Sequence, residues 1–100
     1  MRRISLLLIT LLLLGTTALA EQAKKVDVFV TGWCPYCRKL EQFLKQSNIE
    51  YTRHDVEADA RANKEFNKLG GSGVPVVRVG KDVIYGYDPA GVLAALKTKN

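Results

Sequence analysis

The sequence predicts an α/β fold: one small domain with a mixed four-stranded sheet, whose elements follow the order β-α-β-α-β-β-α. Two observations predict this fold. Short runs of β-branched and aromatic residues alternate with segments whose apolar residues keep helical spacing, and Gly-, Asn- and Pro-containing breaks separate them. The chain has 100 residues, which is enough for one small domain.

The first strand is expected at Val26–Thr31, a β-branched and aromatic run suited to burial. A Gly32-Trp33 turn follows, and Pro35 then stands where proline is tolerated, in the first turn of a helix. One face of that helix is apolar, with residues at i, i+3 and i+4: Leu40, Phe43 and Leu44. The helix is expected to end near Ser47-Asn48.

A second strand is expected at Glu50–Val56, and Asp59 is suited to cap a second helix. The apolar positions of that helix keep helical spacing: Ala62, Phe66 and Leu69. Four residues, Gly70 to Gly73, end the helix and form a loop. A third strand is expected over residues 74–79.

A tight turn at Gly80–Asp82 leads to a hairpin partner at Val83–Tyr85. The last helix is expected to begin at Asp88 or Pro89, with three residues facing inward: Val92, Leu93 and Leu96. Helices between the early strands imply right-handed crossovers onto one sheet, and the final hairpin adds an antiparallel edge.

Residues 1–20 have the pattern of a secretory signal peptide. Arg2 and Arg3 precede an apolar run at Ile4–Leu14, and small residues at Ala18 and Ala20 favour cleavage after Ala20. An uncleaved membrane anchor is the alternative, but the apolar run is shorter than the roughly 20 residues that span a bilayer. We therefore expect an exported domain at residues 21–100, in the periplasm of a bacterium, without stable membrane insertion after cleavage.

The charge of the expected mature domain does not indicate nucleic-acid binding. The full chain has 15 basic and 10 acidic residues, and loss of Arg2 and Arg3 leaves a net charge of +3. The basic residues are dispersed, and no block of five like charges occurs. We interpret these charged residues as ordinary solvated surface residues.

The pair Cys34 and Cys37 is predicted to be a redox dithiol. The two cysteines lie between a predicted strand and the start of a helix, where unpaired backbone N–H groups and the helix dipole stabilise a thiolate. Cys34 is nearest that helix end, so we expect it to be the exposed nucleophile. Cys37, one turn further in and more buried, then attacks Cys34 and releases the product.

Two other interpretations of the cysteine pair, a structural disulfide and a metal site, fit the sequence less well. A structural disulfide would close a very short loop, and stabilisation by a disulfide grows with loop length. A structural zinc site needs four ligands, whereas the chain offers Cys34, Cys37 and the lone His54, which is expected to be a surface or packed residue. We therefore predict no metal site.

Three motifs in order resemble the dithiol glutaredoxins of the thioredoxin superfamily. They are Cys34-Pro35-Tyr36-Cys37 at a strand-to-helix turn, Val74-Pro75 before a strand, and Gly86-Tyr87-Asp88 before the last helix. The similarity extends over residues 26–96 at family spacing. The resemblance implies a thioredoxin-like fold and a glutaredoxin-like domain at residues 21–100.

The resemblance also implies roles for residues outside the dithiol. It implies a cis bond between Val74 and Pro75, which directs the Val74 backbone at the substrate opposite Cys34. Gly86, Tyr87 and Asp88 match the stretch that holds the γ-glutamyl end of glutathione in the family. A plain structural account exists as well, with Gly86 as a turn and Asp88 as a helix cap.

The residues before Cys34 differ from the family pattern. Glutaredoxins usually carry a Lys a few residues before the first Cys, but residues 31–33 here are Thr, Gly and Trp. Trp33 offers an apolar face for a protein substrate, Pro35 stiffens the turn, and Tyr36 adds an aromatic wall. Gly73 stands where the family usually has Thr before Val-Pro. Tyr85, directly before Gly86, stands where the family usually has Gly.

A replacement cation could come from Arg61 or Lys64. The sequence thus predicts an exported, monomeric thiol–disulfide oxidoreductase that acts on protein or glutathione mixed disulfides, with no bound cofactor and glutathione as a candidate co-substrate. Its electron donor or acceptor is not specified by the residues. The alternatives are a redox-sensing module that binds a peptide or protein with little turnover, and a small structural secreted domain.

Overall fold

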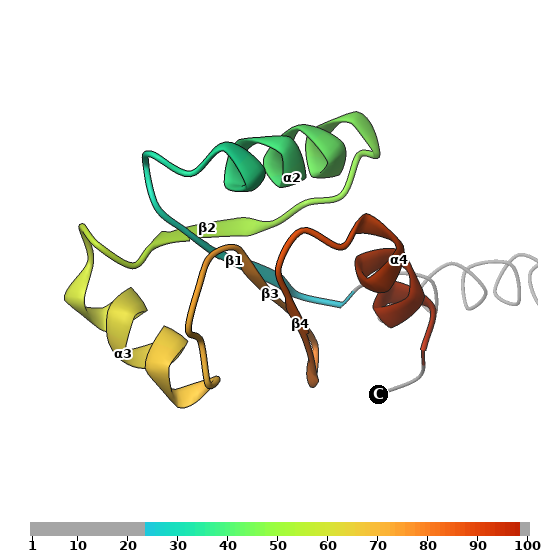
Figure 1. The fold of residues 1–100 in the computed structure, drawn as a ribbon. Helices are drawn as coiled ribbons and strands as arrows, with labels where there is room; N and C mark the ends of the chain where they lie inside the picture. Colours follow the sequence, from blue (N-terminus) through green and yellow to red (C-terminus); the bar gives the residue numbers. More distant parts are fainter. Residues whose placement is uncertain (1–23, 99–100) are drawn as a thin grey trace, which may run out of the picture.

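The computed structural model describes residues 24–98, so the predicted signal peptide lies outside the described residues. Four strands and three helices follow the predicted order, and Figure 1 shows their arrangement. In chain order they are β1 (Val26–Val30), α2 (Pro35–Gln46), β2 (Thr52–Asp55), α3 (Ala60–Lys68), β3 (Val76–Val79), β4 (Asp82–Tyr85) and α4 (Pro89–Lys97). None of the helices within residues 24–98 has the length and apolar character needed to cross a membrane.

The four strands form one mixed sheet in the order β2-β1-β3-β4. β1 and β2 are parallel, as expected for strands joined by the α2 crossover. The expectation of a second crossover of this kind was wrong, because β3 pairs antiparallel with β1. β4 then forms the predicted antiparallel edge beside β3.

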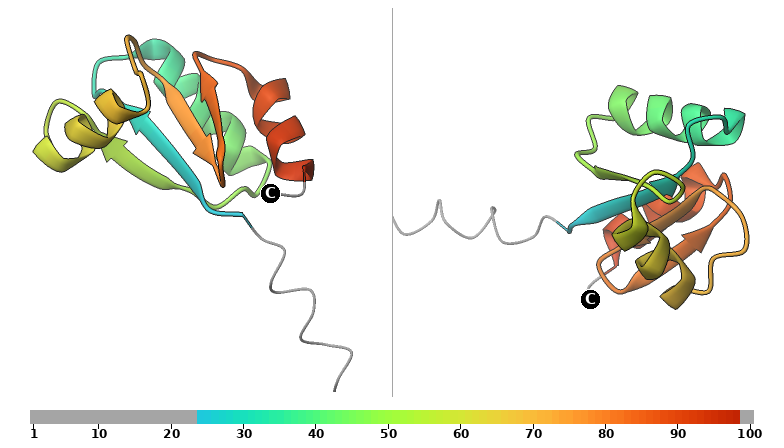
Figure 2. Two further views of the ribbon diagram at one scale, coloured as in Figure 1. Left: turned by 90° about the horizontal axis from the view of Figure 1, so that it is seen from below. Right: turned by 90° about the vertical axis from the view of Figure 1, so that its left-hand side faces the viewer.

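The helices cover the sheet on both sides (Figures 1 and 2). On one face, Leu40 and Leu44 of α2 and Val92 of α4 share a core with alternate residues of β1. On the other face, Phe66 of α3 packs with Phe29 of β1. Every residue of β1 is therefore buried, and this central strand leads directly to the predicted dithiol.

Three strands are shorter than predicted, and one begins earlier. β1 ends at Val30 and not at Thr31. β2 covers residues 52–55 instead of 50–56. β3 begins at Val76 and not at Val74, because Pro75 has no N–H to donate to a sheet ladder. Asp82 belongs to β4, so the turn at Gly80 is tighter than predicted, with a φ of 59° at this glycine.

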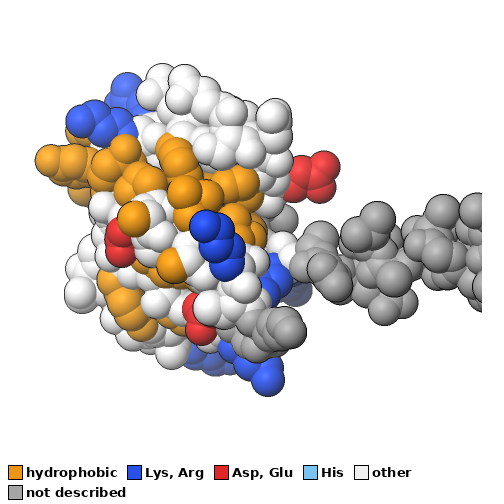
Figure 3. All heavy atoms as spheres, turned by 90° about the vertical axis from the view of Figure 1, so that its right-hand side faces the viewer, with side chains coloured by type: hydrophobic (Ala, Val, Ile, Leu, Met, Phe, Trp, Pro, Cys, Tyr) orange, Lys and Arg blue, Asp and Glu red, His pale blue; other side chains and the backbone are white. Residues whose placement is uncertain are grey.

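The prediction that Leu93 faces inward was wrong. Val92 is fully buried and Leu96 is partly buried, but Leu93 is 40% exposed, and Ala95 takes an inward position in its place. Figure 3 shows hydrophobic side chains gathered on the face that carries α4. The helix is apolar on more than one side, so its composition did not specify which residues would be buried.

A buried charge, Asp27, lies at the centre of an ion-pair network on the α3 side of the sheet. His54 Nε2 lies 2.9 Å from Asp27 Oδ1, and Arg78 Nη2 lies 3.2 Å from Asp27 Oδ2. Arg78 also donates to Glu65 of α3, and His54 stacks on Phe29. The expectation of a surface or packed His54 is thus refined, because the ring links β2 to β1.

Burial alone would raise the pKa of Asp27. The hydrogen bonds to His54 and Arg78 outweigh burial and hold this pKa below its ordinary value of 3.8. A carboxyl whose folded pKa is depressed stabilises the protein at pH values above its unfolded pKa. That contribution is lost as the pH falls through the folded pKa.

We predict that Asp27→Asn lowers the free energy of unfolding by about 2–3 kcal/mol at pH 7, because it leaves Arg78 and His54 without their buried partner. Urea unfolding at pH 7 and at pH 3 provides the test. The difference between wild type and variant is expected to shrink at pH 3. An equal difference at both pH values would contradict a stabilising role for ionised Asp27.

Candidate redox-active site

Cys34 forms the N-cap of α2. Its backbone is extended, with φ −80° and ψ 115°, and its sulfur accepts a hydrogen bond of 3.1 Å from the backbone N–H of Cys37. Pro35 occupies the first helical position, where its missing N–H costs no helix hydrogen bond. A cap sulfur held against the helix N-terminus is stabilised as a thiolate by this N–H and by the helix dipole.

Both cysteines are free thiols and both are buried. Cys37 is 1% exposed, as expected for the inner cysteine, but the expectation of an exposed Cys34 was wrong, because Cys34 is only 4% exposed. The two side chains belong to the core between α2, α4 and the sheet, and Val74 packs against that core. Only a small area of Cys34 is therefore accessible to an attacking group.

The Val74–Pro75 peptide bond is cis, as the resemblance implied. The Val74 carbonyl oxygen lies 3.9 Å from Cys34 Sγ, so the backbone before Pro75 faces the first cysteine. The backbone N–H of Gly86 donates to the Pro75 carbonyl over 2.8 Å, with Gly86 at a φ of 81°. Three predicted site segments therefore meet around Cys34.

The aromatic residues predicted to shape the site are exposed. Trp33, Tyr36 and Tyr87 are 63%, 58% and 43% exposed. The rings of Tyr36 and Tyr87 lie 6.0 Å apart between centroids, and Lys39 Nζ lies 5.5 Å from the Tyr36 ring centre. Tyr36 and Tyr87 therefore form a continuous aromatic wall contributed by two distant parts of the chain.

Asp88 forms the N-cap of α4, where its Oδ1 accepts a 2.9 Å hydrogen bond from the Gly91 N–H. This is the plain structural account that the sequence left open, and a substrate contact of Asp88 stays a prediction. Within residues 24–98, no side-chain hydrogen bond or ion pair joins Arg61 or Lys64, the proposed replacement cations, to the site segments. Arg61 instead lines a separate hollow with Phe29 and His54.

Sequence reasoning missed Glu57, which lies in the turn between β2 and α3. Its Oε1 accepts a 2.9 Å hydrogen bond from Trp33 Nε1. The two residues are 24 positions apart, so no local pattern indicated this contact.

In the described part of the chain, no group of three or more His, Cys, Asp or Glu side chains is placed to hold a metal ion.

The glutaredoxin family model matches residues 26–84, which include the dithiol, the Val74–Pro75 segment and all four strands except the last residue of β4. The chain belongs to the glutaredoxin family. A glutaredoxin-like 8.6 kDa protein from the rubredoxin operon of Clostridium pasteurianum is 32% identical over 66 residues, which cover 65% of this chain and 88% of that protein. Glutaredoxin-1 of Homo sapiens is 36% identical over 74 residues, covering 65% of this chain and 68% of that protein.

A solved structure supports the thioredoxin-like fold of this glutaredoxin. The thioredoxin-like protein BC3987 superimposes with a TM-score of 0.66 at 28% identity, over 71% of this chain and 99% of that chain. The glutaredoxin of Archaeoglobus fulgidus has a TM-score of 0.64 at 22% identity, over 84% of this chain and 99% of that chain, and supports the fold alone. As a glutaredoxin, the protein is a thiol–disulfide oxidoreductase.

The two thiols of this glutaredoxin differ in their electrostatic surroundings. Burial, the largest cause, and the hydrogen bond with Cys34 raise the pKa of Cys37 to about 12, although a backbone hydrogen bond with Thr31 acts in the opposite direction. Cys37 is therefore a neutral thiol at physiological pH. It becomes a nucleophile only when its surroundings change or a base accepts its proton.

We predict that Cys37 in a Cys34→Ser variant reacts with iodoacetamide at a rate that rises about tenfold per pH unit between pH 7 and pH 10, because burial is retained in that variant. Mass spectrometry of timed samples measures the rate, and the Cys37→Ser variant is the control. We expect the control, with only Cys34 present, to be modified at least about tenfold faster at pH 7. A rate for Cys37 that levels off below pH 9 would contradict its burial as a neutral thiol.

Proposed function

We propose that Cys34 is the attacking thiolate and Cys37 the resolving thiol of this oxidoreductase, with protein or glutathione mixed disulfides as substrates. The observation that carries the proposal is the Cys34 sulfur, which accepts the α2 N-terminal amide of Cys37 and faces the Val74 carbonyl. A substrate cysteine that approaches Cys34 must pass this carbonyl. Its backbone N–H can donate to the carbonyl, which orients the disulfide for attack.

The reaction proceeds in two exchanges. The Cys34 thiolate attacks a substrate disulfide, a bond forms between Cys34 Sγ and one substrate sulfur, and the other substrate sulfur leaves as a thiolate that takes up a proton. Cys37 then loses its proton and attacks Cys34 Sγ, which releases the second substrate thiol. The protein ends with a Cys34–Cys37 disulfide and has given two electrons to the substrate. A thiol donor, such as two glutathione molecules or a dithiol reductase, returns them.

Trp33, Tyr36 and Tyr87 are proposed to form the walls of the substrate groove, with Pro35, Val74, Pro75, Gly86 and Asp88 maintaining its shape. Exposed aromatic rings beside a nucleophile provide a large contact area for an apolar peptide segment. All these residues come from one chain, so we propose that the protein acts as a monomer. No bound cofactor takes part in the exchange.

Turnover assays with two variants test the roles of the cysteines. We expect Cys34→Ser to reduce both insulin-disulfide reduction and hydroxyethyl-disulfide turnover to background, because no attacking thiolate remains. Cys37→Ser should lose insulin reduction and accumulate a mixed disulfide at Cys34, but retain turnover of glutathione mixed disulfides. Background rates for wild type in both assays would instead favour a redox-sensing binding module.

We further propose that this glutaredoxin acts outside the cytosol, on the basis of the signal-like residues 1–20. Expression of the full chain in a bacterium followed by cell fractionation and N-terminal sequencing tests this. We expect a periplasmic protein that begins at Glu21. An intact chain that begins at Met1 and stays in the cytosol would overturn the proposed location.

A further inference from the structure

Trp33 is held in one orientation although most of its surface is exposed. The indole N–H donates to Glu57 Oε1 over 2.9 Å, while 63% of the side chain remains open to solvent. Trp33 directly precedes Cys34 in the chain, so its ring is attached one residue from the proposed attacking cysteine. Without such a partner, an exposed ring would sample several rotamers. Fixing the ring in one rotamer when a substrate binds would then cost conformational entropy.

Glu57 is itself fixed by the turn in which it lies. Asp55 Oδ1 accepts hydrogen bonds of 2.9 Å from the backbone N–H groups of Glu57 and Ala58. The next residue after Asp55, Val56, donates its backbone N–H to the Val30 carbonyl over 3.0 Å, which attaches the turn to the end of β1. Glu57 is therefore presented from the same end of the sheet as the dithiol, by a turn with its own hydrogen bonds.

The backbone hydrogen bonds from Ala58 and Glu57 lower the pKa of Asp55 below its ordinary value of 3.8. Asp55 is therefore ionised at neutral pH, the state in which its carboxylate accepts both amides. The turn that presents Glu57 is thus maintained across the physiological pH range. This geometry does not depend on a bound substrate.

The Glu57 carboxylate also places a negative charge against Trp33, whereas Lys39 lies over Tyr36 on the other wall of the site. Residues 31–33 contain no cation, so on this side of the site the charge adjacent to Trp33 is negative. Glutathione carries two carboxylates and one ammonium group, and is anionic at neutral pH. A basic peptide segment around a disulfide would instead be attracted by this carboxylate, and a neutral segment would not be repelled, whereas like-charge juxtaposition disfavours an anionic substrate.

We propose that Glu57 is a positioning and specificity residue that holds Trp33 as a docking wall and favours disulfides in neutral or basic peptide segments over anionic ones. This inference rests on the proposed role of Cys34 as the attacking thiolate. Glu57 acts on the substrate through Trp33 and through its charge, and takes no part in sulfur exchange. Its removal should therefore change substrate binding more than the chemical step.

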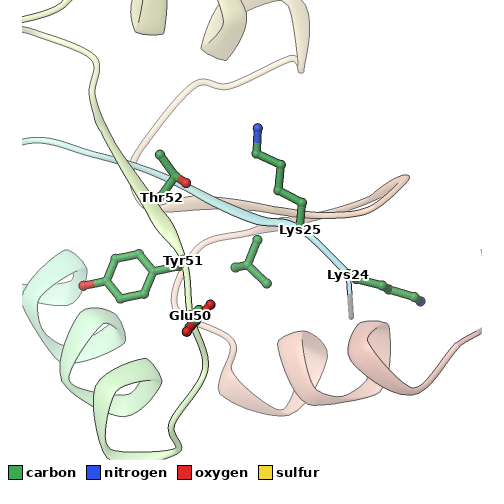
Figure 4. Close-up of a pocket in the computed structure, with 6 residues that line it drawn as sticks. Lys24, Lys25, Glu50, Tyr51 and Thr52 are labelled. Atoms are coloured by element: carbon green, nitrogen blue, oxygen red, sulfur yellow. The ribbon is translucent and has the colours of Figure 1, made fainter. Parts of the chain in front are cut away.

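The test compares Glu57→Gln, which keeps a side-chain oxygen for the indole N–H but removes the charge, with Glu57→Ala, which removes both. The control is Glu50→Gln, which changes the net charge by the same amount. Glu50 lines a hollow with Lys24, Lys25, Tyr51 and Thr52 where β1 and β2 begin, at the end of the sheet opposite the dithiol (Figure 4). The substrates are two peptides of equal length with one disulfide each, flanked by two Lys or by two Glu residues.

We expect wild type to prefer the Lys peptide by about threefold to tenfold in kcat/KM, the size expected for solvent-exposed charges. Glu57→Gln should reduce this preference to less than about twofold, and Glu50→Gln should retain it. Glu57→Ala should raise KM for both peptides with little change in kcat. Because Trp33 is the only tryptophan in the sequence, fluorescence anisotropy reports its motion directly and should fall in Glu57→Ala but not in Glu57→Gln.

Two results would overturn the inference. One is an unchanged Lys-over-Glu preference in Glu57→Gln, and the other is unchanged Trp33 anisotropy in Glu57→Ala. Added salt supplies a second check, because it should reduce the wild-type preference through screening. If Cys34→Ser still turns over either peptide, the proposed function fails. If wild type turns over both peptides through Cys34 with equal kcat/KM, only the role of Glu57 fails.

Discussion

The hydrogen bond from the Cys37 amide to the Cys34 sulfur is the interaction on which the site depends. It makes Cys34 the cap of α2, so that one residue ends the loop after β1, begins the helix and places its sulfur at the helix N-terminus. The position of this cap is set by β1, the fully buried central strand. Helices pack on both faces of the sheet around β1, so the position of the last residue of β1 is fixed. Only a short turn separates that residue from Cys34.

The same arrangement makes the two thiols unequal. The Cys34 sulfur lies against the N-terminus of α2, whereas burial raises the pKa of Cys37 to about 12 and keeps it neutral. In the proposed mechanism this difference gives the exchange an order, with attack by Cys34 first and resolution by Cys37 second. In the proposed mechanism, the Val74 carbonyl and the aromatic wall of Tyr36 and Tyr87 restrict the direction from which a disulfide can reach Cys34.

Much of this arrangement could be predicted from local sequence patterns. The spacing of Cys34 and Cys37 at the start of an amphipathic helix indicated the dithiol and its position at the helix N-terminus, and Asp59 was correctly predicted to cap α3. Features that depend on tertiary contacts could not be predicted in this way. The burial of Cys34 results from its place in the core that residues of the sheet, α2 and α4 share. The contact between Trp33 and Glu57 joins segments that precede α2 and follow β2.

Rapid quenching of a single turnover tests the central claim most directly. Wild-type protein is mixed with a glutathione mixed disulfide, quenched in acid within milliseconds, and mapped by mass spectrometry. We predict that the first adduct lies on Cys34 and is replaced by the Cys34–Cys37 disulfide or released by a second glutathione. A first adduct that lies on Cys37, or is divided equally between the two cysteines, would contradict the assignment of Cys34 as the attacking sulfur.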